Sequence, residues 1–229
     1  MGGFPGLFRL SFTHRPDDLF MTFQGSCANF PVCAELDQKL VPTRTVAPEY
    51  PANMEDAETG GQVLVDQLRI HNVDTAFCVP GESYLAVIDA LHDAANEIKL
   101  VSCRQEGGAA NMAEAYAKVT GKPGVCTAAS GPGTLNLLTG MYTAAVDCAP
   151  MVVLGGASPV HEIGRDAFQE IDQVGVMQPI CKYVHRPTMA ARYPEIVSTA
   201  YRQSLSGRPG PVYIDCGADV LYEEIEEDT

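Results

Sequence analysis

The sequence predicts an α/β domain in which a mostly parallel β-sheet carries helices on both faces. Short apolar runs alternate with longer segments whose apolar residues recur at helical spacing. Glycine or proline follows several of these runs, as expected where a strand ends in a loop. Strands that alternate with helices are joined by right-handed crossovers, so neighbouring strands run parallel and helices cover the sheet.

The first half of this pattern begins at Thr59. Thr59 and Gln62 have the spacing of a capping box, which predicts the start of a helix. The apolar run TAFCV (75–79) predicts a buried strand, because Pro80 and Gly81 end it directly. A helix over 83–96, a strand over 99–103 and a helix over 106–119 follow in order.

The second half repeats the alternation. The run GVCTAA (124–129) predicts a third strand, and Gly131-Pro132-Gly133 separates it from a helix over 134–146. The run PMVVLGG (150–156) predicts a fourth strand, which a loop with one short helix follows over 157–180. The remaining segments predict a helix, a strand and a solvated acidic tail, at 194–205, 211–216 and 221–229.

Three loops in this scheme follow strands and contain residues suited to binding. They are Val79-Pro80-Gly81, Arg104-Gln105-Glu106 and the segment from Ser130 to Gly133. In parallel sheets, ligands bind beyond the carboxyl ends of the strands. We therefore expect all three loops at one rim of the sheet.

Composition excludes several classes of function. The net charge of −14 disfavours binding to nucleic acid or to anionic membranes, and no apolar run is long enough to span a bilayer. The eight cysteines include no CxxC pair and the five histidines are scattered, so we expect neither disulfides nor a metal site. Buried cysteines of this kind indicate a reducing, cytoplasmic location. Five cysteines lie in or beside apolar runs: Cys78, Cys103, Cys126, Cys148 and Cys216.

Residues 1–53 differ from the rest of the chain. Prolines recur there and no helix or strand period persists. We expect either a disordered extension or a stretch that precedes the natural start of translation at Met54. The folded domain is then expected over 54–220.

Glu106 stands where an apolar run gives way to a helix rich in small residues. An acidic residue in the first turn of a helix is stabilised by the helix dipole, and this alone can explain it. However, glycine and alanine follow it at unusual density over 107–110, which lets another helix or a flat ligand approach closely.

Gly131, Gly133 and Asn136 give a weak match to the GxGxxG dinucleotide fingerprint. A nucleotide-binding oxidoreductase that uses NAD(P) therefore stays open as an alternative. The other reading of these glycines is a tight turn between strand and helix.

The segment RQEGGAANMAEAYAKVTGKPGVCTAASGPGTLNLLTG resembles the pyrimidine-binding domain of thiamine-diphosphate enzymes of the acetolactate synthase-like superfamily. The blocks FCVPGESYLAVIDAL and IGRDAFQEIDQVGVMQPICKYV extend the resemblance in the same order. It covers residues from about Gly60 to Asp215 and implies an enzyme that makes or breaks C–C bonds next to a carbonyl, with a 2-oxo acid as substrate.

The resemblance also implies roles for individual residues. Glu106 corresponds to the glutamate that hydrogen-bonds N1′ of the cofactor's aminopyrimidine. Such a carboxyl group favours the imino tautomer, whose 4′ nitrogen takes the C2 proton of the thiazolium, and it works best when shielded from water. The residues that match the cofactor pocket are Pro80, Gly81, Pro132 and Asn136. Those that match the substrate region are Phe168, Gln169 and Lys182.

Two departures bear on the reaction. Ala157 stands where acetolactate synthases usually have glutamine, and Glu82 replaces a glycine. These differences argue against FAD and against acetolactate synthesis proper. A lyase, decarboxylase or carboligase relative fits equally well.

The family's other cofactor-binding element is not found in the chain. Thiamine diphosphate is held through Mg²⁺ by a second domain with a Gly-Asp-Gly…Asn pattern, which these 229 residues lack. We therefore expect a homo-oligomer or a second chain that carries that domain, and this chain to be a truncated product or a separate subunit. The alternative is a degenerate relative that acts as a non-catalytic interaction subunit.

Overall fold

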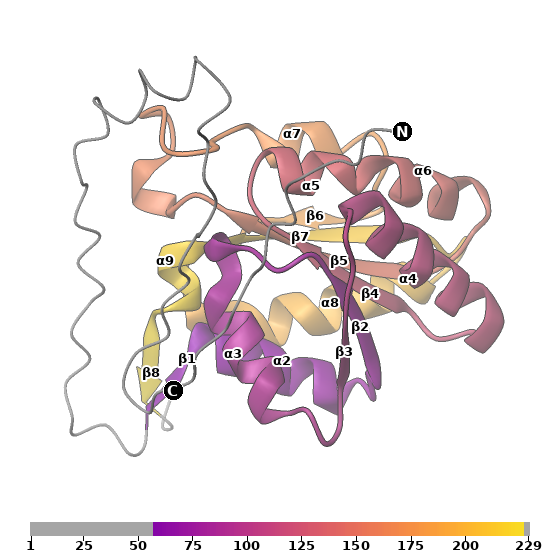
Figure 1. Cartoon of the computed structure of the whole chain (residues 1–229), viewed down its shortest axis with the longest axis horizontal. Coiled ribbons are helices and arrows are strands. Elements are labelled where there is room, and N and C mark those ends of the chain that lie inside the picture. The colour runs from indigo at the N-terminus through magenta and orange to yellow at the C-terminus, as the bar shows by residue number, and fades with distance from the viewer. Residues whose placement is uncertain (1–56, 227–229) are drawn as a thin grey trace, which may run out of the picture. The chain divides into compact units, whose positions relative to one another are not determined.

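A computed structural model describes residues 57–226 and confirms the predicted α/β class. Its main sheet has six parallel strands in the order β3-β2-β4-β5-β7-β6 (Figure 1). In chain order these are β2 (Thr75–Cys78), β3 (Lys99–Ser102), β4 (Gly124–Ala128), β5 (Met151–Ala157), β6 (Val184–His185) and β7 (Pro211–Gly217).

Helices cover both faces of this sheet, as the sequence predicts (Figure 1). One face carries α2 (Gly60–Ile70), α3 (Leu85–Asp93) and α8 (Tyr193–Leu205), and the core on that side includes Leu64, Leu91 and Ile196. The opposite face carries α4 (Glu106–Thr120), α5 (Pro132–Asn136), α6 (Leu138–Val146) and α7 (Gln173–Met177). None of the described helices is both long and apolar enough to cross a bilayer.

Small residues allow α4 and α6 to pack closely on the second face. A Cβ atom built on Gly140 of α6 would lie 2.5 Å from the Cβ atom of Ala110 on α4. Ala110 and its neighbours Ala109 and Ala113 are fully buried, together with Leu137 and Met141. The glycine and alanine content of this segment therefore serves packing within the chain as well as any approach from outside.

The start of α2 has the predicted capping box. The Thr59 side chain accepts a hydrogen bond from the Gln62 N–H at 3.3 Å, and the Gln62 side chain accepts one from the Thr59 N–H at 2.7 Å. These bonds satisfy two donors at the helix start that have no partner within the helix.

We expect Thr59→Ala to lower the free energy of unfolding by about 1 kcal/mol, because the Gln62 N–H loses the Thr59 hydroxyl as its acceptor. Urea unfolding followed by circular dichroism measures the change. Thr188→Ala is the matched control, since Thr188 is exposed and outside any helix or strand. An equal loss in both variants would show that the capping box contributes nothing.

The acidic segment near the end of the chain is more ordered than predicted. Residues Glu224–Glu226 form strand β8, which pairs antiparallel with β1 (Ala57–Thr59) in a separate two-stranded sheet. Ile225 between two glutamates packs against the core, which is the physical reason that this segment is a strand and not a solvated tail. The short helix α9 (Ala218–Leu221) precedes it and was also not predicted.

Two other details differ from the sequence-based expectation. The helix predicted over 134–146 is divided into α5 and α6 at Leu137. The strand β6 was missed because it has only two residues and no apolar run around it. The predicted boundary between residues 53 and 54 lies outside the described residues.

Candidate functional site

The loops that follow β2, β3 and β4 meet at the carboxyl end of the sheet, as predicted. An added Cβ on Gly81, after β2, would lie 2.5 Å from the Cβ of Ala129, after β4. The Ser83 hydroxyl accepts a hydrogen bond from the Ser130 N–H at 2.9 Å and joins the same two loops. Pro80 and Pro132 are exposed at this rim.

Glu106 lies at the first position of α4 on this rim. The Gln105 side chain caps the helix by accepting a hydrogen bond from the Gly108 N–H at 2.9 Å. This arrangement aims the positive end of the helix dipole at the Glu106 carboxylate. The capping role of Gln105 was not predicted, because glutamine is not among the residues usually favoured at that position.

One oxygen of the half-buried Glu106 carboxylate is held and the other is available. Asn136 donates a hydrogen bond from Nδ2 to Glu106 Oε2 at 3.0 Å. Glu106 Oε1 has no hydrogen-bond partner in the described part of the chain and lies 3.5 Å from where a Cβ of Gly133 would stand. The structure thus brings together two residues that are 30 positions apart and that were both predicted as site residues.

Gln169 and Gln173 contact the Gly131 turn. Gly131 has φ +59°, and a Cβ built there would lie 2.5 Å from the Gln169 carbonyl oxygen, so a side chain would be both strained and obstructed. The Gly131 N–H donates to Oε1 of Gln173 at 2.6 Å. An amide that is already bonded within the chain is not available to a phosphate, so the geometry gives no support to a dinucleotide site here.

A buried polar network lies behind this turn. Asp215 is wholly buried in β7, where its carboxylate accepts hydrogen bonds from Arg186, Tyr213 and Gln173. Arg186 also forms an ion pair with Asp215. No motif in the sequence pointed to these residues, although a charged residue inside the apolar run PVYIDC is a signal of a buried polar network.

The three residues predicted for the substrate region lie in different places. Gln169 is next to the Gly131 turn, where its Oε1 accepts from the Ser130 hydroxyl at 3.2 Å. Phe168 beside it is 80% exposed. Lys182 is not brought to this rim: its amine donates to the carbonyls of Gln203 and Ser206, and its N–H bonds Pro211 at the opposite, amino end of β7.

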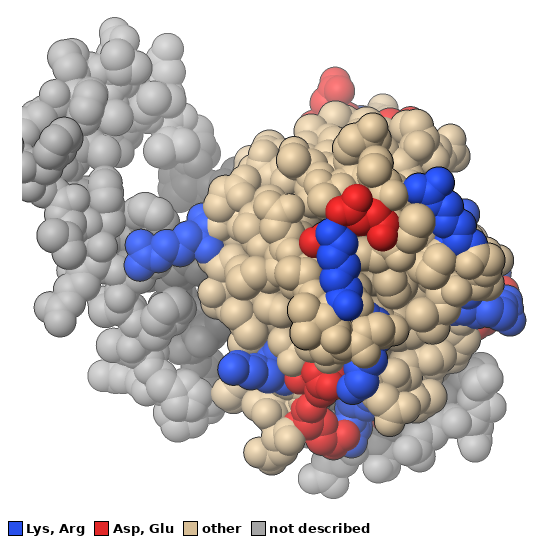
Figure 2. Space-filling view, turned by 90° about the vertical axis from the view of Figure 1, so that its right-hand side faces the viewer, with Lys and Arg blue, Asp and Glu red and all other residues tan. Residues whose placement is uncertain are grey.

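Glu114 on α4 is not the solvated charge that helix position alone suggests. The residue is only 7% exposed, and its carboxylate forms an ion pair with Lys118. Lys118 also pairs with Asp147 at the end of α6, at 2.5 Å. Figure 2 shows one face of the domain on which acidic and basic side chains stand beside one another on a largely uncharged surface.

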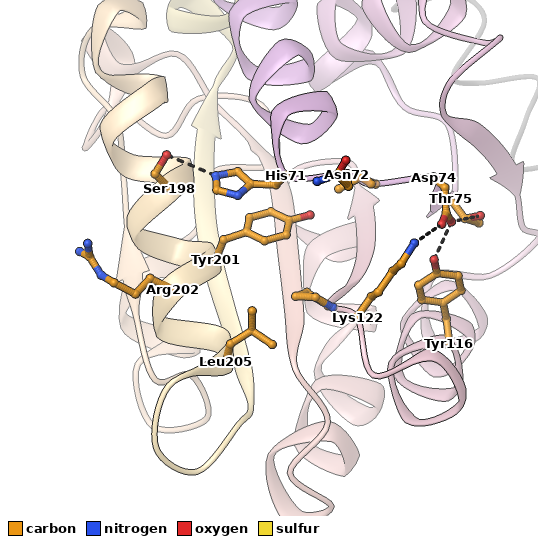
Figure 3. Close-up of a pocket in the computed structure, with 12 residues that line it drawn as sticks. His71, Asn72, Asp74, Thr75, Tyr116, Lys122, Ser198, Tyr201, Arg202 and Leu205 are labelled. Atoms are coloured by element: carbon orange, nitrogen blue, oxygen red, sulfur yellow. Dashed lines mark hydrogen bonds and ion pairs between the residues drawn. The ribbon is translucent and has the colours of Figure 1, made fainter.

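The larger of two described cavities, of about 350 Å³, lies at the amino ends of the strands and contains none of the predicted site residues. In Figure 3 the Tyr116 hydroxyl and the Lys122 amine both point to Asp74, and His71 stacks on Tyr201 with ring centroids 4.3 Å apart. The hydrogen bond from Lys122, and to a lesser degree the one from Tyr116, lowers the pKa of Asp74 to about 2. Asp74 and Lys122 are therefore paired with each other, whereas Arg202, which also lines the cavity, bonds the Thr199 hydroxyl at 3.4 Å.

The second cavity, of about 170 Å³, lies beyond β5 at the carboxyl end of the sheet. Gln173 and Arg186 of the buried network line it, together with Ser158 and Glu170. It is therefore close to the Gly131 turn, which Gln173 bonds, and Glu106 is not among its lining residues.

Comparison with known proteins gives one family match and a set of relatives. Residues 58–176, more than half of the chain, match the model of "Thiamine pyrophosphate enzyme, N-terminal TPP binding domain". The chain is 44% identical over 187 residues to the acetolactate synthase large subunit of Parasynechococcus marenigrum, an alignment that covers 81% of this chain and 30% of the relative.

Two further relatives show the same partial coverage. The acetolactate synthase of Arthrospira platensis is 45% identical over 73% of this chain and 29% of its own length. The mitochondrial catalytic subunit of acetolactate synthase from Saccharomyces cerevisiae is 42% identical over 71% of this chain and 23% of its own length. The chain therefore spans less than a third of the length of these relatives.

Proposed function

Because this chain belongs to the thiamine pyrophosphate enzymes and corresponds to their N-terminal TPP-binding domain, we propose that its rim binds the aminopyrimidine end of thiamine diphosphate. We further propose that the complete protein makes or breaks a C–C bond next to a carbonyl group, with a 2-oxo acid as substrate. The relatives named acetolactate synthase support this class of reaction.

The observation that carries the proposal is the geometry of Glu106. One carboxylate oxygen is fixed by Asn136 and the other faces Gly133 without a partner among the described residues. A free carboxyl oxygen can share one proton with a ring nitrogen: the protonated acid donates to the nitrogen, and the carboxylate accepts from the protonated ring. Gly133 has no side chain to fill the space beside this oxygen, where a Cβ would lie 3.5 Å from it, so the residues present fit a flat heterocycle.

Each residue of the rim then has a definite task. Glu106 shares a proton with the ring nitrogen, donating it or taking it back, while Asn136 fixes the carboxylate in one orientation. Gln105 and the start of α4 keep the carboxylate at the rim. When bound, thiamine diphosphate supplies the carbon nucleophile and the electron sink for the C–C bond chemistry.

The site on this chain is half of what the cofactor needs. Its diphosphate end is expected to bind through Mg²⁺, which prefers oxygen ligands and substrate phosphates. Among the described residues, no group of three His, Cys, Asp or Glu side chains is arranged to hold a metal ion. We therefore propose that a domain outside these 229 residues supplies the Mg²⁺-diphosphate motif, and we call the combination the assembled site.

Exposed apolar side chains on the α4–α6 face support such a partner. Met112 is 39% exposed, Tyr142 62% and Val146 52%. Contact with a partner would bury them and would also shield Glu106 from water, since that residue is only half-buried in this chain.

Titration calorimetry with thiamine diphosphate and Mg²⁺ tests the proposal. We expect weak or undetectable binding to this chain alone and strong binding to the assembled site, because most of the binding free energy belongs to the Mg²⁺-diphosphate end. Thiamine, which lacks the diphosphate, is the matched ligand control. Tight binding by the chain alone would contradict the shared site, and no binding by the assembled site would favour a non-catalytic interaction subunit.

A further inference from the structure

Gln173 makes more hydrogen bonds than its place on a five-residue helix would suggest. Its side chain is 1% exposed. Three acceptors share the two hydrogens of its Nε2: Gly156 O at 3.1 Å, the Tyr213 hydroxyl at 2.8 Å and Asp215 Oδ1 at 2.6 Å. Its Oε1 accepts from the Gly131 N–H at 2.6 Å.

These partners allow only one orientation of the Gln173 amide. All three groups around Nε2 can accept a hydrogen bond, and the Tyr213 proton is used toward Asp215 at 2.7 Å. The group opposite Oε1 is a backbone N–H, which can only donate. A flipped amide would place its NH₂ against the Gly131 N–H and its oxygen against the Asp215 carboxylate, so both sides would repel.

The Gln173 amide is held in place by the buried Asp215 carboxylate. Asp215 is buried and ionically paired with Arg186, so the carboxylate that anchors Nε2 cannot move toward solvent. Gln173 therefore connects β7 to the loop after β4 through two hydrogen bonds, each of which spans 42 residues of sequence.

The loop held in this way leads directly to Glu106. Gly131 is the residue before α5, and Asn136 at the end of that helix donates to Glu106 Oε2. A shift of the Gly131 turn would carry α5 with it, because α5 has only five residues. The Glu106 carboxylate would then lose the partner that orients it.

We propose that Gln173 is a positioning residue, which acts through Gly131 and Asn136 to hold Glu106 in its working orientation. The inference rests on the proposed function of the rim. It adds a residue from outside the three loops and assigns a role to the buried network of Asp215.

The test compares two substitutions at Gln173 with one on the same helix. Gln173→Leu keeps a side chain of similar size but removes every hydrogen bond that the amide makes. Gln173→Glu can donate to Asp215 and accept from Gly131 only while its new carboxyl group is protonated. Met177→Ala is the control, because Met177 is wholly buried on α7 and a cavity there destabilises the domain without touching the turn.

Deuterium exchange of the cofactor C2 proton, at saturating cofactor in the assembled site, is the first readout. We expect Gln173→Leu to slow exchange by about 10²-fold, as for a displaced catalytic group, and Met177→Ala to stay within about threefold. In Gln173→Glu, the rate relative to the unmodified protein should fall as pH rises, because ionisation removes the donor and adds a charge next to Asp215. An unchanged rate in Gln173→Leu, or an equal loss in Met177→Ala, would overturn the proposal.

Amide hydrogen exchange at Gly131, measured by NMR on the full chain without cofactor, is the second readout. We expect slow exchange in the unmodified chain and in Met177→Ala, and fast exchange in Gln173→Leu. This measurement separates the two hypotheses. If the unmodified assembled site bound no thiamine diphosphate, the proposed function would fail, whereas equal Gly131 exchange in all variants would refute the positioning role by itself.

Discussion

Replacing Glu106 with glutamine in the assembled site is expected to slow exchange of the cofactor C2 proton by ~10²–10⁴-fold, the range for loss of a positioned acid–base group. Glutamine keeps the size of the side chain and can still bond Asn136 and a ring nitrogen. It cannot exchange a proton with that nitrogen. Cofactor affinity measured by calorimetry should therefore change little while the exchange rate measured by NMR falls.

The control for this substitution is Glu195→Gln. Glu195 is an acidic residue in the first turn of α8, as Glu106 is in α4, but its side chain is 68% exposed and pairs with Arg192 at 3.1 Å. Glu114 would be a poor control, because its side chain is buried and paired with Lys118. Equal exchange rates in Glu106→Gln and the unmodified protein would leave Glu106 with a helix-dipole role only.

The second large effect is expected in folding. Asp215→Ala should lower the free energy of unfolding by about 3–5 kcal/mol, because it leaves the partly buried Arg186 charge and the buried Tyr213 hydroxyl without their acceptor. Urea unfolding at neutral pH, followed by circular dichroism, measures this loss.

Asp93→Ala is the matched control, since Asp93 is exposed at the end of α3 and a surface change of this kind stays within about 0.5 kcal/mol. The further substitution Arg186→Met in the Asp215→Ala background should recover part of the loss, because it removes the uncompensated charge. A loss below about 1 kcal/mol for Asp215→Ala would mean that the buried pair contributes little net stability.

Most of the fold could be predicted because its signals are local. The helix at Thr59 and the strand at 75–78 each depend on residues within a few positions of one another. Strands β1, β6 and β8 could not be predicted, because each has two or three residues and is stabilised by pairing with a distant segment. Their sequences carry no period long enough to detect.

The candidate site divides in the same way. Glu106, Gly81 and Asn136 were identified through motif resemblance, and the structure places them on one rim. The Gln173–Asp215 network depends on contacts 42 residues apart, which no local pattern encodes. Lys182 is the converse case: the motif resemblance implies a place near the substrate, whereas in this chain the residue lies at the amino end of β7.

The two-stranded sheet of β1 and β8 determines how the domain responds to a pulling force. Ala57 is paired with Glu226 and Thr59 with Glu224, so the outer ends of both strands lie at the same end of the ribbon. A force that draws residues 57 and 226 apart loads these hydrogen bonds one after another and not all at once. The ribbon should therefore open like a zipper at low force, while the six-stranded sheet behind it stays intact.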